Sequence, residues 1–244
     1  MKRTKSGIPG FDEITGGGFP TGTCCLVSGN VGAGKTTFGM QFLYNGIVQY
    51  NENGIYVALE ERPEDLRAEM LVFGWELSEL ERKNKLVILD VTATRHGIRR
   101  NSEMVVNTVG RSIDIRGLAA EIYGTANETN AKRIVVDSIP SLELRMKDVM
   151  EVRKATSQLV NLLLEMNRTS IVITELTSTN GFSRYGFEEY VTRGVVVLRM
   201  VSQYGELRRS IQVVKMRGTK HSTRTYPLEI TENGIVVQAR RELY

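Results

Sequence analysis

A glycine-rich segment at residues 29–37 carries the sharpest chemical pattern in this chain of 244 residues. It fits the spacing G-x-x-x-x-G-K-[ST], in which glycines let successive backbone N–H groups turn toward one anion. The lysine of this pattern suits β- and γ-phosphates, and its hydroxyl residue suits Mg²⁺. The segment therefore predicts a nucleoside triphosphate site formed by Gly29, Asn30, Val31, Gly32, Ala33, Gly34, Lys35, Thr36 and Thr37.

The sequence around this segment supports the prediction. An apolar run at Thr23–Ser28 is typical of a buried strand, and Thr36–Gln49 has the period of an amphipathic helix. A helix that begins at the loop adds the positive end of its dipole to the phosphate site. The alternative, a glycine-rich turn without a ligand, does not explain why lysine and threonine follow at this spacing.

A phosphate site of this kind needs a carboxylate for the metal, and Asp137 is the candidate. It follows the apolar residues Ile134–Val136, so it stands at the end of a buried strand. There it fits the Walker B role, in which it would hold Mg²⁺ together with Thr36. The alternative is that Asp137 only caps the following turn.

Hydrolysis also needs a group that orients water, and Glu60 and Glu61 are the candidates. They end the strand Ile55–Leu59, and the carboxyl ends of strands line the ligand crevice of an open α/β sheet. Adjacent carboxylates repel, so we expect one of the two to have a raised pKa. The alternative is that both begin a solvated helix.

The pattern that positions these residues is an alternation of short β-branched runs and longer segments of helical period. It predicts an α/β fold, with a mostly parallel twisted sheet flanked by helices. The expected strands are Thr23–Ser28, Ile55–Leu59, Leu86–Val91, Ile134–Asp137 and Ser170–Thr174, and the expected helices are Thr36–Gln49, one from Pro63, Ile113–Asn127 and Met150–Asn167. After Gly194 the pattern changes to adjacent strands, with a hairpin at Asn233-Gly234, so antiparallel strands should extend the sheet.

Composition narrows the class of protein. The hydrophobic fraction of 41% and the ordinary glycine content exclude a disordered, collagen-like or coiled-coil chain. Two adjacent cysteines, Cys24 and Cys25, predict core packing rather than a disulfide framework. A net charge of +4 gives no argument for nucleic acid or membrane, and we see no leader pattern. We expect one domain over residues 1–244, with a leading segment at 1–22, and a cytoplasmic location.

Four strings occur in the order known for one family: SGIPGFDEITGGGFPTGTCCLVSGNVGAGKTTFGMQFL, LEERPEDLRAEMLVFGWEL, IVVDS and VVKMRGTKH followed by YPLEIT. Over nearly its whole length the chain resembles the KaiC-like branch of the RecA/RadA superfamily. It is most similar to the amino-terminal, ATP-hydrolysing half of the two-domain clock ATPase of that branch. Only one such domain is present here, so a clock role is not implied.

The resemblance implies a RecA-type core that binds ATP or ADP with Mg²⁺ between the protomers of a ring, usually a hexamer. Glu60 and Glu61 would match the catalytic glutamate pair, with Glu60 the first choice for activating water. The segment K-M-R-G-T-K-H would reach the nucleotide of the adjacent protomer through Lys215, Met216, Arg217, Thr219 and His221. From the residues alone, Lys215 and Arg217 could equally form a basic face of an exposed strand.

Departures from the relatives limit what the resemblance implies. The clock protein phosphorylates itself on a Ser-Thr pair, whereas the comparable region here has Glu189-Tyr190, so autokinase activity is doubtful. Recombinase relatives bind single-stranded DNA through loops that correspond to residues 139–149 and 176–193. The second loop combines aromatic residues and arginines with Glu188 and Glu189, so ring contacts are the preferred explanation.

Three functional hypotheses remain. The first is an oligomeric Mg²⁺-dependent ATPase, and the alternative is an ATP-dependent recombinase paralogue that binds single-stranded DNA. The third is an assembly switch with slow hydrolysis that recruits a protein partner not identified by the sequence. Thr174 and Glu175 could sense the γ-phosphate, the basic cluster Arg95–Arg100 could meet a partner, and Trp75 should pack against a helix end.

Overall fold

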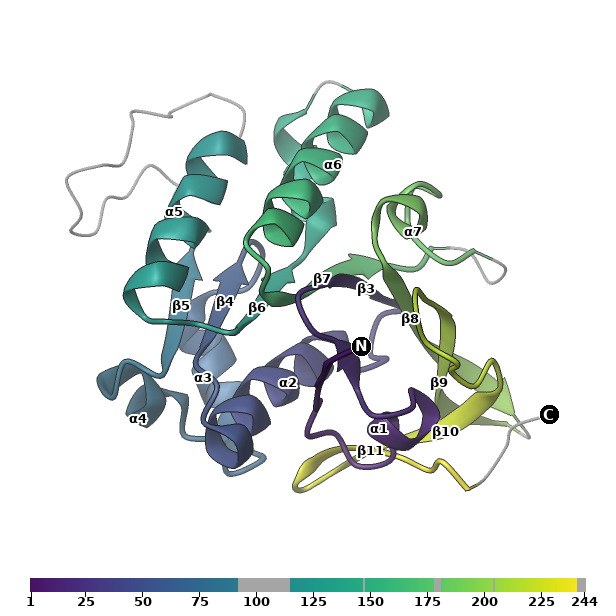
Figure 1. Ribbon diagram of the computed structural model, residues 1–244. Helices are drawn as coiled ribbons and strands as arrows, with labels where there is room; N and C mark the ends of the chain where they lie inside the picture. Colours follow the sequence, from purple (N-terminus) through teal and green to yellow (C-terminus); the bar gives the residue numbers. More distant parts are fainter. Residues whose placement is uncertain (92–114, 147, 178–180, 204, 241–244) are drawn as a thin grey trace.

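A nine-stranded sheet forms the centre of the part of the chain that the computed structural model describes, which is residues 1–91, 115–146, 148–177, 181–203 and 205–240 (Figure 1). Its strand order is β11-β10-β9-β8-β3-β7-β6-β4-β5, and β1 and β2 form a separate antiparallel pair. The strands are β1 (Arg3–Thr4), β2 (Phe19–Pro20), β3 (Cys24–Gly29), β4 (Gly54–Ala58), β5 (Leu86–Asp90), β6 (Arg133–Asp137), β7 (Thr169–Glu175), β8 (Gly194–Gln203), β9 (Glu206–Met216), β10 (Thr225–Thr231) and β11 (Gly234–Val237).

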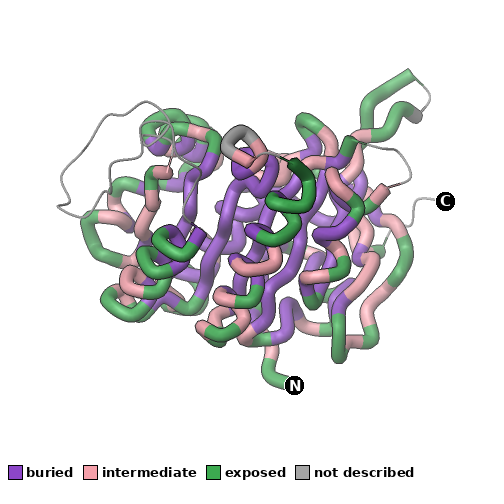
Figure 2. Tube along the Cα trace, turned by 90° about the horizontal axis from the view of Figure 1, so that it is seen from above, coloured by how far each residue is buried: buried purple, intermediate pink, exposed green. Residues whose placement is uncertain are grey.

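Helices cover both faces of this sheet, and Figure 2 shows the buried strands running through the middle of the molecule. One face is covered by α2, α3 and α4, and the other by α5 and α6. The helices are α1 (Phe11–Ile14), α2 (Lys35–Tyr50), α3 (Pro63–Leu71), α4 (Leu77–Arg82), α5 (Ile115–Glu128), α6 (Val149–Glu165) and α7 (Glu188–Val191), with a 3-10 helix η2 at Ile139–Arg145.

The two faces of the sheet belong to two separate hydrophobic cores because successive side chains of a strand point in opposite directions. The two cysteines illustrate this: Cys25 packs in the core on the α2 side, and Cys24 packs in the core on the α5–α6 side. Both thiols are buried, as the sequence predicts. Burial raises the pKa of Cys25 to about 12, so its thiol stays neutral.

The leading segment, residues 1–22, forms β1, α1 and β2 and packs its aromatic rings against α2. Phe11 lies 5.3 Å from Phe38 in an edge-to-face arrangement, and Phe19 lies 5.4 Å from Phe42. In the middle of α2, Tyr44 stacks on Trp75 with ring centroids 5.3 Å apart. The Trp75 ring thus lies against the middle of α2, whereas the Trp75 N–H donates to the Met70 carbonyl in the last turn of α3 over 3.2 Å.

The predicted α/β class is confirmed, with bounds that differ by a few residues from the expected ones. The strands β8, β3, β7, β6, β4 and β5 are parallel, and the antiparallel extension begins at β9, one strand later than expected, because β8 still runs parallel to β3. The hairpin after β10 pairs Thr231 with Gly234, so its two loop residues are Glu232 and Asn233, one position earlier than the Asn-Gly pair suggests. Gly234 takes the positive φ of 103°.

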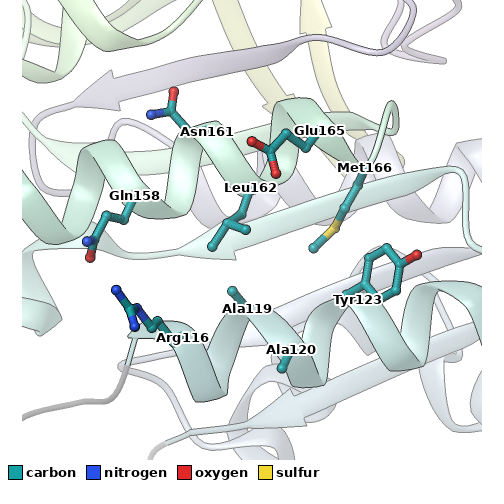
Figure 3. Close-up of a pocket in the computed structure, with 9 residues that line it drawn as sticks. All are labelled: Arg116, Ala119, Ala120, Tyr123, Gln158, Asn161, Leu162, Glu165 and Met166. Atoms are coloured by element: carbon teal, nitrogen blue, oxygen red, sulfur yellow. The ribbon is translucent and has the colours of Figure 1, made fainter.

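A groove of about 590 Å³ lies between α5 and α6, on the face of the sheet opposite α2 (Figure 3). Its side chains come from positions three and four apart on each helix, which is the spacing of one helix face. They are Arg116, Ala119, Ala120, Tyr123, Gln158, Asn161, Leu162, Glu165 and Met166. None of them belongs to the predicted nucleotide site.

Among the helices described, none is long and apolar enough to cross a membrane.

One buried amide connects α2 to the far edge of the sheet. The Gln41 side chain donates from Nε2 to the Ile235 carbonyl over 3.0 Å and accepts from the Ile235 N–H over 2.6 Å. It therefore pairs with β11 as a neighbouring strand would. Gln41 is 1% exposed. Loss of its amide would therefore leave the N–H and carbonyl of Ile235 without a hydrogen-bond partner, because water does not reach them.

We expect Gln41→Met to lower the free energy of unfolding by about 2–4 kcal/mol, because an unsatisfied buried polar group costs about 1–3 kcal/mol. Urea denaturation measures this difference. Gln49→Met, at an exposed position of the same helix, is the matched control and should change stability by less than about 0.5 kcal/mol. Equal stability of the two variants would contradict the role given to this amide.

Candidate nucleotide-binding site

Four neighbouring parallel strands end at the same edge of the sheet, and each end carries predicted site residues. Gly29 at the end of β3 pairs with Glu175 at the end of β7, and Ala58 at the end of β4 pairs with Asp137 at the end of β6. The ladder continues one step further, because the Leu59 N–H donates to the Asp137 carbonyl over 2.8 Å. The sheet therefore brings the phosphate loop, Glu60 and Asp137 to one edge, as expected for an open α/β sheet.

The phosphate loop, residues 29–37, has the backbone geometry of an anion site. Gly32 and Gly34 have φ angles of 74° and 96°, a region that side chains with a Cβ rarely adopt. Helix α2 begins at Lys35 without a side-chain cap and without an acidic residue in its first turn. The N–H groups of that turn therefore remain available for an anion, which the helix dipole favours.

Lys35 is held across its own loop. Its Nζ donates to the Asn30 carbonyl over 3.1 Å. Burial lowers the pKa of Lys35, while the carboxylates of Asp137, Glu175 and Glu60 oppose this effect. A partly desolvated ammonium group among carboxylates suits the binding of a phosphate chain, whose charge it can neutralise.

The predicted metal ligands meet directly. The Thr36 hydroxyl donates to Asp137 Oδ2 over 2.8 Å, which joins the first turn of α2 to the end of β6. Burial raises the pKa of Asp137, and hydrogen bonds from Tyr56 and Thr36 act in the opposite direction. The described residues contain no group of three His, Cys, Asp or Glu side chains that could hold a metal. One carboxylate and one hydroxyl suit Mg²⁺, which keeps several waters and takes phosphate oxygens as further ligands.

The two candidate glutamates have different surroundings. Glu60 is exposed, and its Oε2 accepts hydrogen bonds from the Ser138 hydroxyl over 2.7 Å and the Ser141 hydroxyl over 3.3 Å. Both serines lie just after β6, and the peptide bond between Asp137 and Ser138 is cis. Glu60 thus has a fixed direction, because one of its carboxylate oxygens accepts two hydroxyl donors.

Glu61 is the glutamate whose pKa is raised. Burial raises the pKa of Glu61 to about 7, and the charges of Glu69, Asp137 and Asp65 add to this effect. The sequence predicts a raised pKa for one member of the pair, but the cause differs from the expected one. Repulsion comes from the Glu69 and Asp65 carboxylates of α3 and from Asp137, not from the adjacent Glu60.

Two contacts that the sequence analysis does not predict support the phosphate loop from outside. The Asn30 side chain accepts from the Met200 N–H over 3.2 Å, so the loop is bonded to β8. The Arg209 Nε donates to the Gly32 carbonyl over 2.8 Å, so it is bonded to β9 as well. Such pairs depend on strand register, and no local sequence pattern reveals them.

The residues predicted to reach the nucleotide of an adjacent protomer lie at the amino ends of the parallel strands, whereas the phosphate loop lies at their carboxyl ends. Met216 pairs with Gly194, which in turn pairs with Cys25 near the start of β3, whereas the phosphate loop follows the end of β3. Three or four residues of strand, about 10–13 Å, separate these two levels. Lys215 and its neighbours are therefore remote from the phosphate loop of their own chain.

Not all of these residues are accessible. The exposed member is Arg217, and Lys215 and His221 are half-buried. Lys215 Nζ donates to the Glu189 carbonyl over 2.6 Å, and burial lowers the pKa of Lys215. The Met216 side chain is buried in the core, and the Thr219 hydroxyl is buried without a hydrogen-bond partner among the described residues. Side-chain contacts from Met216 and Thr219 to a neighbour are therefore not supported.

The loop at residues 176–193 uses several of its described polar and aromatic side chains in contacts within the protein. Arg184 pairs with Glu175 and with Glu143, and the Tyr185 hydroxyl donates to Glu143 over 2.6 Å. The Tyr185 ring stacks on Phe187, which is buried. These groups are engaged within the protein, whereas Tyr190 and Phe182 of the same loop are 73% and 37% exposed, so only part of the stacking surface that single-stranded DNA would need is removed.

Glu188 anchors the same loop to β7. Its buried carboxylate accepts hydrogen bonds from the Thr174 hydroxyl over 3.1 Å and the Ser183 hydroxyl over 2.8 Å. Thr174 is therefore engaged with Glu188, which does not favour it as a γ-phosphate sensor. The other loop, residues 139–149, contains η2. The basic cluster Arg95–Arg100 lies outside the described residues.

Comparisons with known proteins agree with this geometry. A family model described as "ATPase: KaiC" matches residues 4–242. The chain belongs to the KaiC family of ATPases. A KaiC-like protein from Pyrococcus horikoshii OT3 has a crystal structure that matches 97% of this chain and 98% of its own, with a TM-score of 0.84 and 43% identity. The resemblance seen in the sequence is thus confirmed for both family and fold.

Curated relatives of this KaiC-family chain include proteins of two lengths. The UPF0273 protein of Thermotoga maritima is 42% identical over 97% of this chain and 96% of its own. The circadian clock oscillator protein KaiC of Parathermosynechococcus lividus is 38% identical over 96% of this chain but only 42% of its own. The chain therefore spans less than half the length of the clock protein.

The raised pKa of Glu61 predicts a pH dependence of stability in metal-free protein. A carboxyl whose folded pKa is raised from 4.5 to about 7 loses stabilising effect as pH rises through that interval. The free energy of unfolding of Glu61→Gln, relative to that of the wild type, should therefore rise by about 1–2 kcal/mol between pH 4.5 and pH 8. This figure allows for solvent screening of the half-exposed group.

Urea denaturation in the presence of a chelator measures this difference. Glu128→Gln, at an exposed position of α5, is the control and should follow the wild-type pH dependence. If Glu61→Gln and the wild type kept a constant difference across this pH range, the assigned pKa shift would be wrong.

Proposed function

We propose that this KaiC-family protein binds ATP with Mg²⁺ and hydrolyses it at interfaces between protomers of a ring. The observation that carries the proposal is the meeting of three elements at one sheet edge: the phosphate loop, the Thr36–Asp137 pair and Glu60. The family supports ATPase activity in general. Mg²⁺ dependence, the ring and the roles of single residues are the proposed part.

The residues divide the work of hydrolysis as follows. The N–H groups of the phosphate loop and Lys35 bind the β- and γ-phosphates, and Thr36 and Asp137 would hold Mg²⁺. When bound, the metal neutralises charge on the phosphate oxygens. Glu60, fixed by Ser138 and Ser141, orients a water molecule and accepts its proton. A bond forms between the water oxygen and the γ-phosphorus, the bond from that phosphorus to the bridging oxygen breaks, and ADP and phosphate leave.

The position of Lys215 and Arg217 supports an arrangement in which neighbours share sites. Both lie at the amino edge of the parallel strands, and the phosphate loop lies at the carboxyl edge. In a ring, the nucleotide that these residues can contact is therefore the one bound to a neighbouring copy. An inserted arginine accelerates phosphoryl transfer by about 10³–10⁵-fold, so its location on a neighbour would couple hydrolysis to assembly.

We expect the double variant Glu60→Gln and Glu61→Gln to bind ATP normally and to turn it over at least about tenfold more slowly, because it lacks the proton acceptor. Release of phosphate measures turnover, and equilibrium binding of a fluorescent ATP analogue measures affinity. Glu128→Gln serves again as the control. Wild-type turnover by the double variant would remove both glutamates from the mechanism.

Mixing two inactive variants tests the shared site. Lys215→Ala with Arg217→Ala keeps the phosphate loop and Glu60 intact, and the double glutamine variant keeps the basic residues. In randomly mixed rings about a quarter of the sites would combine both intact halves, so about a quarter of wild-type phosphate release should return. The mass in solution with ATP, with ADP and without nucleotide establishes assembly. A mixture that assembles but stays inactive would contradict the trans roles.

A further inference from the structure

A buried tyrosine contacts the carboxylate proposed to hold the metal. Tyr56 lies on β4, is 1% exposed, and donates from its hydroxyl to Asp137 Oδ2 over 2.7 Å. This oxygen is the same one that accepts the Thr36 hydroxyl over 2.8 Å. Within the described residues, no side chain donates a hydrogen bond to the other oxygen, Oδ1.

The sheet places Tyr56 for this contact. On the adjacent strands β4 and β6, Tyr56 is paired with Val135, and both belong to the core on the α2 side. Asp137 is two residues beyond Val135, so its side chain points to the same face. The phenol thus extends along the sheet from one strand to the diagonal neighbour on the next, and its ring is fixed by the surrounding core.

We propose that Tyr56 is a positioning residue for the metal site, and this inference rests on the proposed function. Two hydroxyl donors from different elements act on one carboxylate oxygen and so fix the rotation of the Asp137 carboxyl group. Oδ2 is then committed to the protein, and Oδ1 is the oxygen that remains for Mg²⁺ or for water bound to it. Partners of this kind, which orient a ligand without touching the metal, change metal affinity by about 10–100-fold.

A purely structural role is the competing explanation. The Tyr56 hydroxyl would then only satisfy a buried carboxylate, which would otherwise lack one of its donors. Loss of the hydroxyl would in that case weaken the fold and the phosphate loop in general. The two roles differ in one measurable respect: a positioning residue changes affinity for the metal but not for nucleotide in the absence of metal.

The experiment measures Mn²⁺, a paramagnetic substitute for Mg²⁺, in the complex of the protein with ADP. The signal of free Mn²⁺ in electron paramagnetic resonance gives the dissociation constant of the metal. For Tyr56→Phe, which keeps the ring, we expect this constant to rise about tenfold or more. ADP affinity in the presence of a chelator should stay within about twofold of the wild-type value. The midpoint temperature of thermal unfolding of the metal-free form should stay within a few degrees of the wild-type value.

Two further variants frame the result. Tyr44→Phe removes a tyrosine hydroxyl in the middle of α2, where the ring stacks on Trp75, and should leave metal affinity unchanged. Asp137→Asn replaces the carboxylate itself and sets the largest loss to expect.

Each remaining outcome decides a separate point. Equal Mn²⁺ affinity of Tyr56→Phe and the wild type overturns the inference and leaves the proposed function in place. Loss of ADP binding in chelator by Tyr56→Phe also overturns it, because the hydroxyl would then support the loop in general. A wild-type protein that binds neither ADP nor Mn²⁺–ADP overturns the proposed function and, with it, this role of Tyr56.

Discussion

The hydrogen bond from the Thr36 hydroxyl to Asp137 is the contact on which the site depends, because it joins the helix that follows the phosphate loop to the sheet. Helix α2 is further fixed by the aromatic rings of the leading segment and by the Gln41 amide at β11. These anchors lie at different points along the helix. They hold its first turn, and with it the phosphate loop, at a defined distance from the ends of β4 and β6.

Much of the fold and of the site follows from local sequence patterns. Apolar runs that end in a chemically active residue reveal both a strand and its carboxyl end, which is why Glu60 and Asp137 could be placed at one edge in advance. The loop spacing around Lys35 predicts its geometry in the same way, because only glycine tolerates the backbone angles at Gly32 and Gly34. These features depend on residues close together in the chain.

The remaining features depend on pairs far apart in the chain, which a single sequence does not reveal. Tyr56 reaches Asp137 only because β4 and β6 are neighbours, and Arg209 reaches Gly32 only because β9 lies beside β8. Glu60 and Glu61 look equivalent in sequence. Their difference comes from the serines after β6 and from the acidic residues of α3, whose approach is a property of the tertiary structure.

Strand β9 connects the two ends of the parallel strands. Its Arg209 is bonded to the phosphate loop, and six residues further on, about 20 Å along an extended chain, it carries Lys215 at the opposite edge. Between those points β9 pairs with β8, with an irregularity in register between Val195 and Val196, and with β10 from Arg209 to Gln212. The contact to the phosphate loop and the basic residue at the other end are thus carried by one continuous strand of the same protomer.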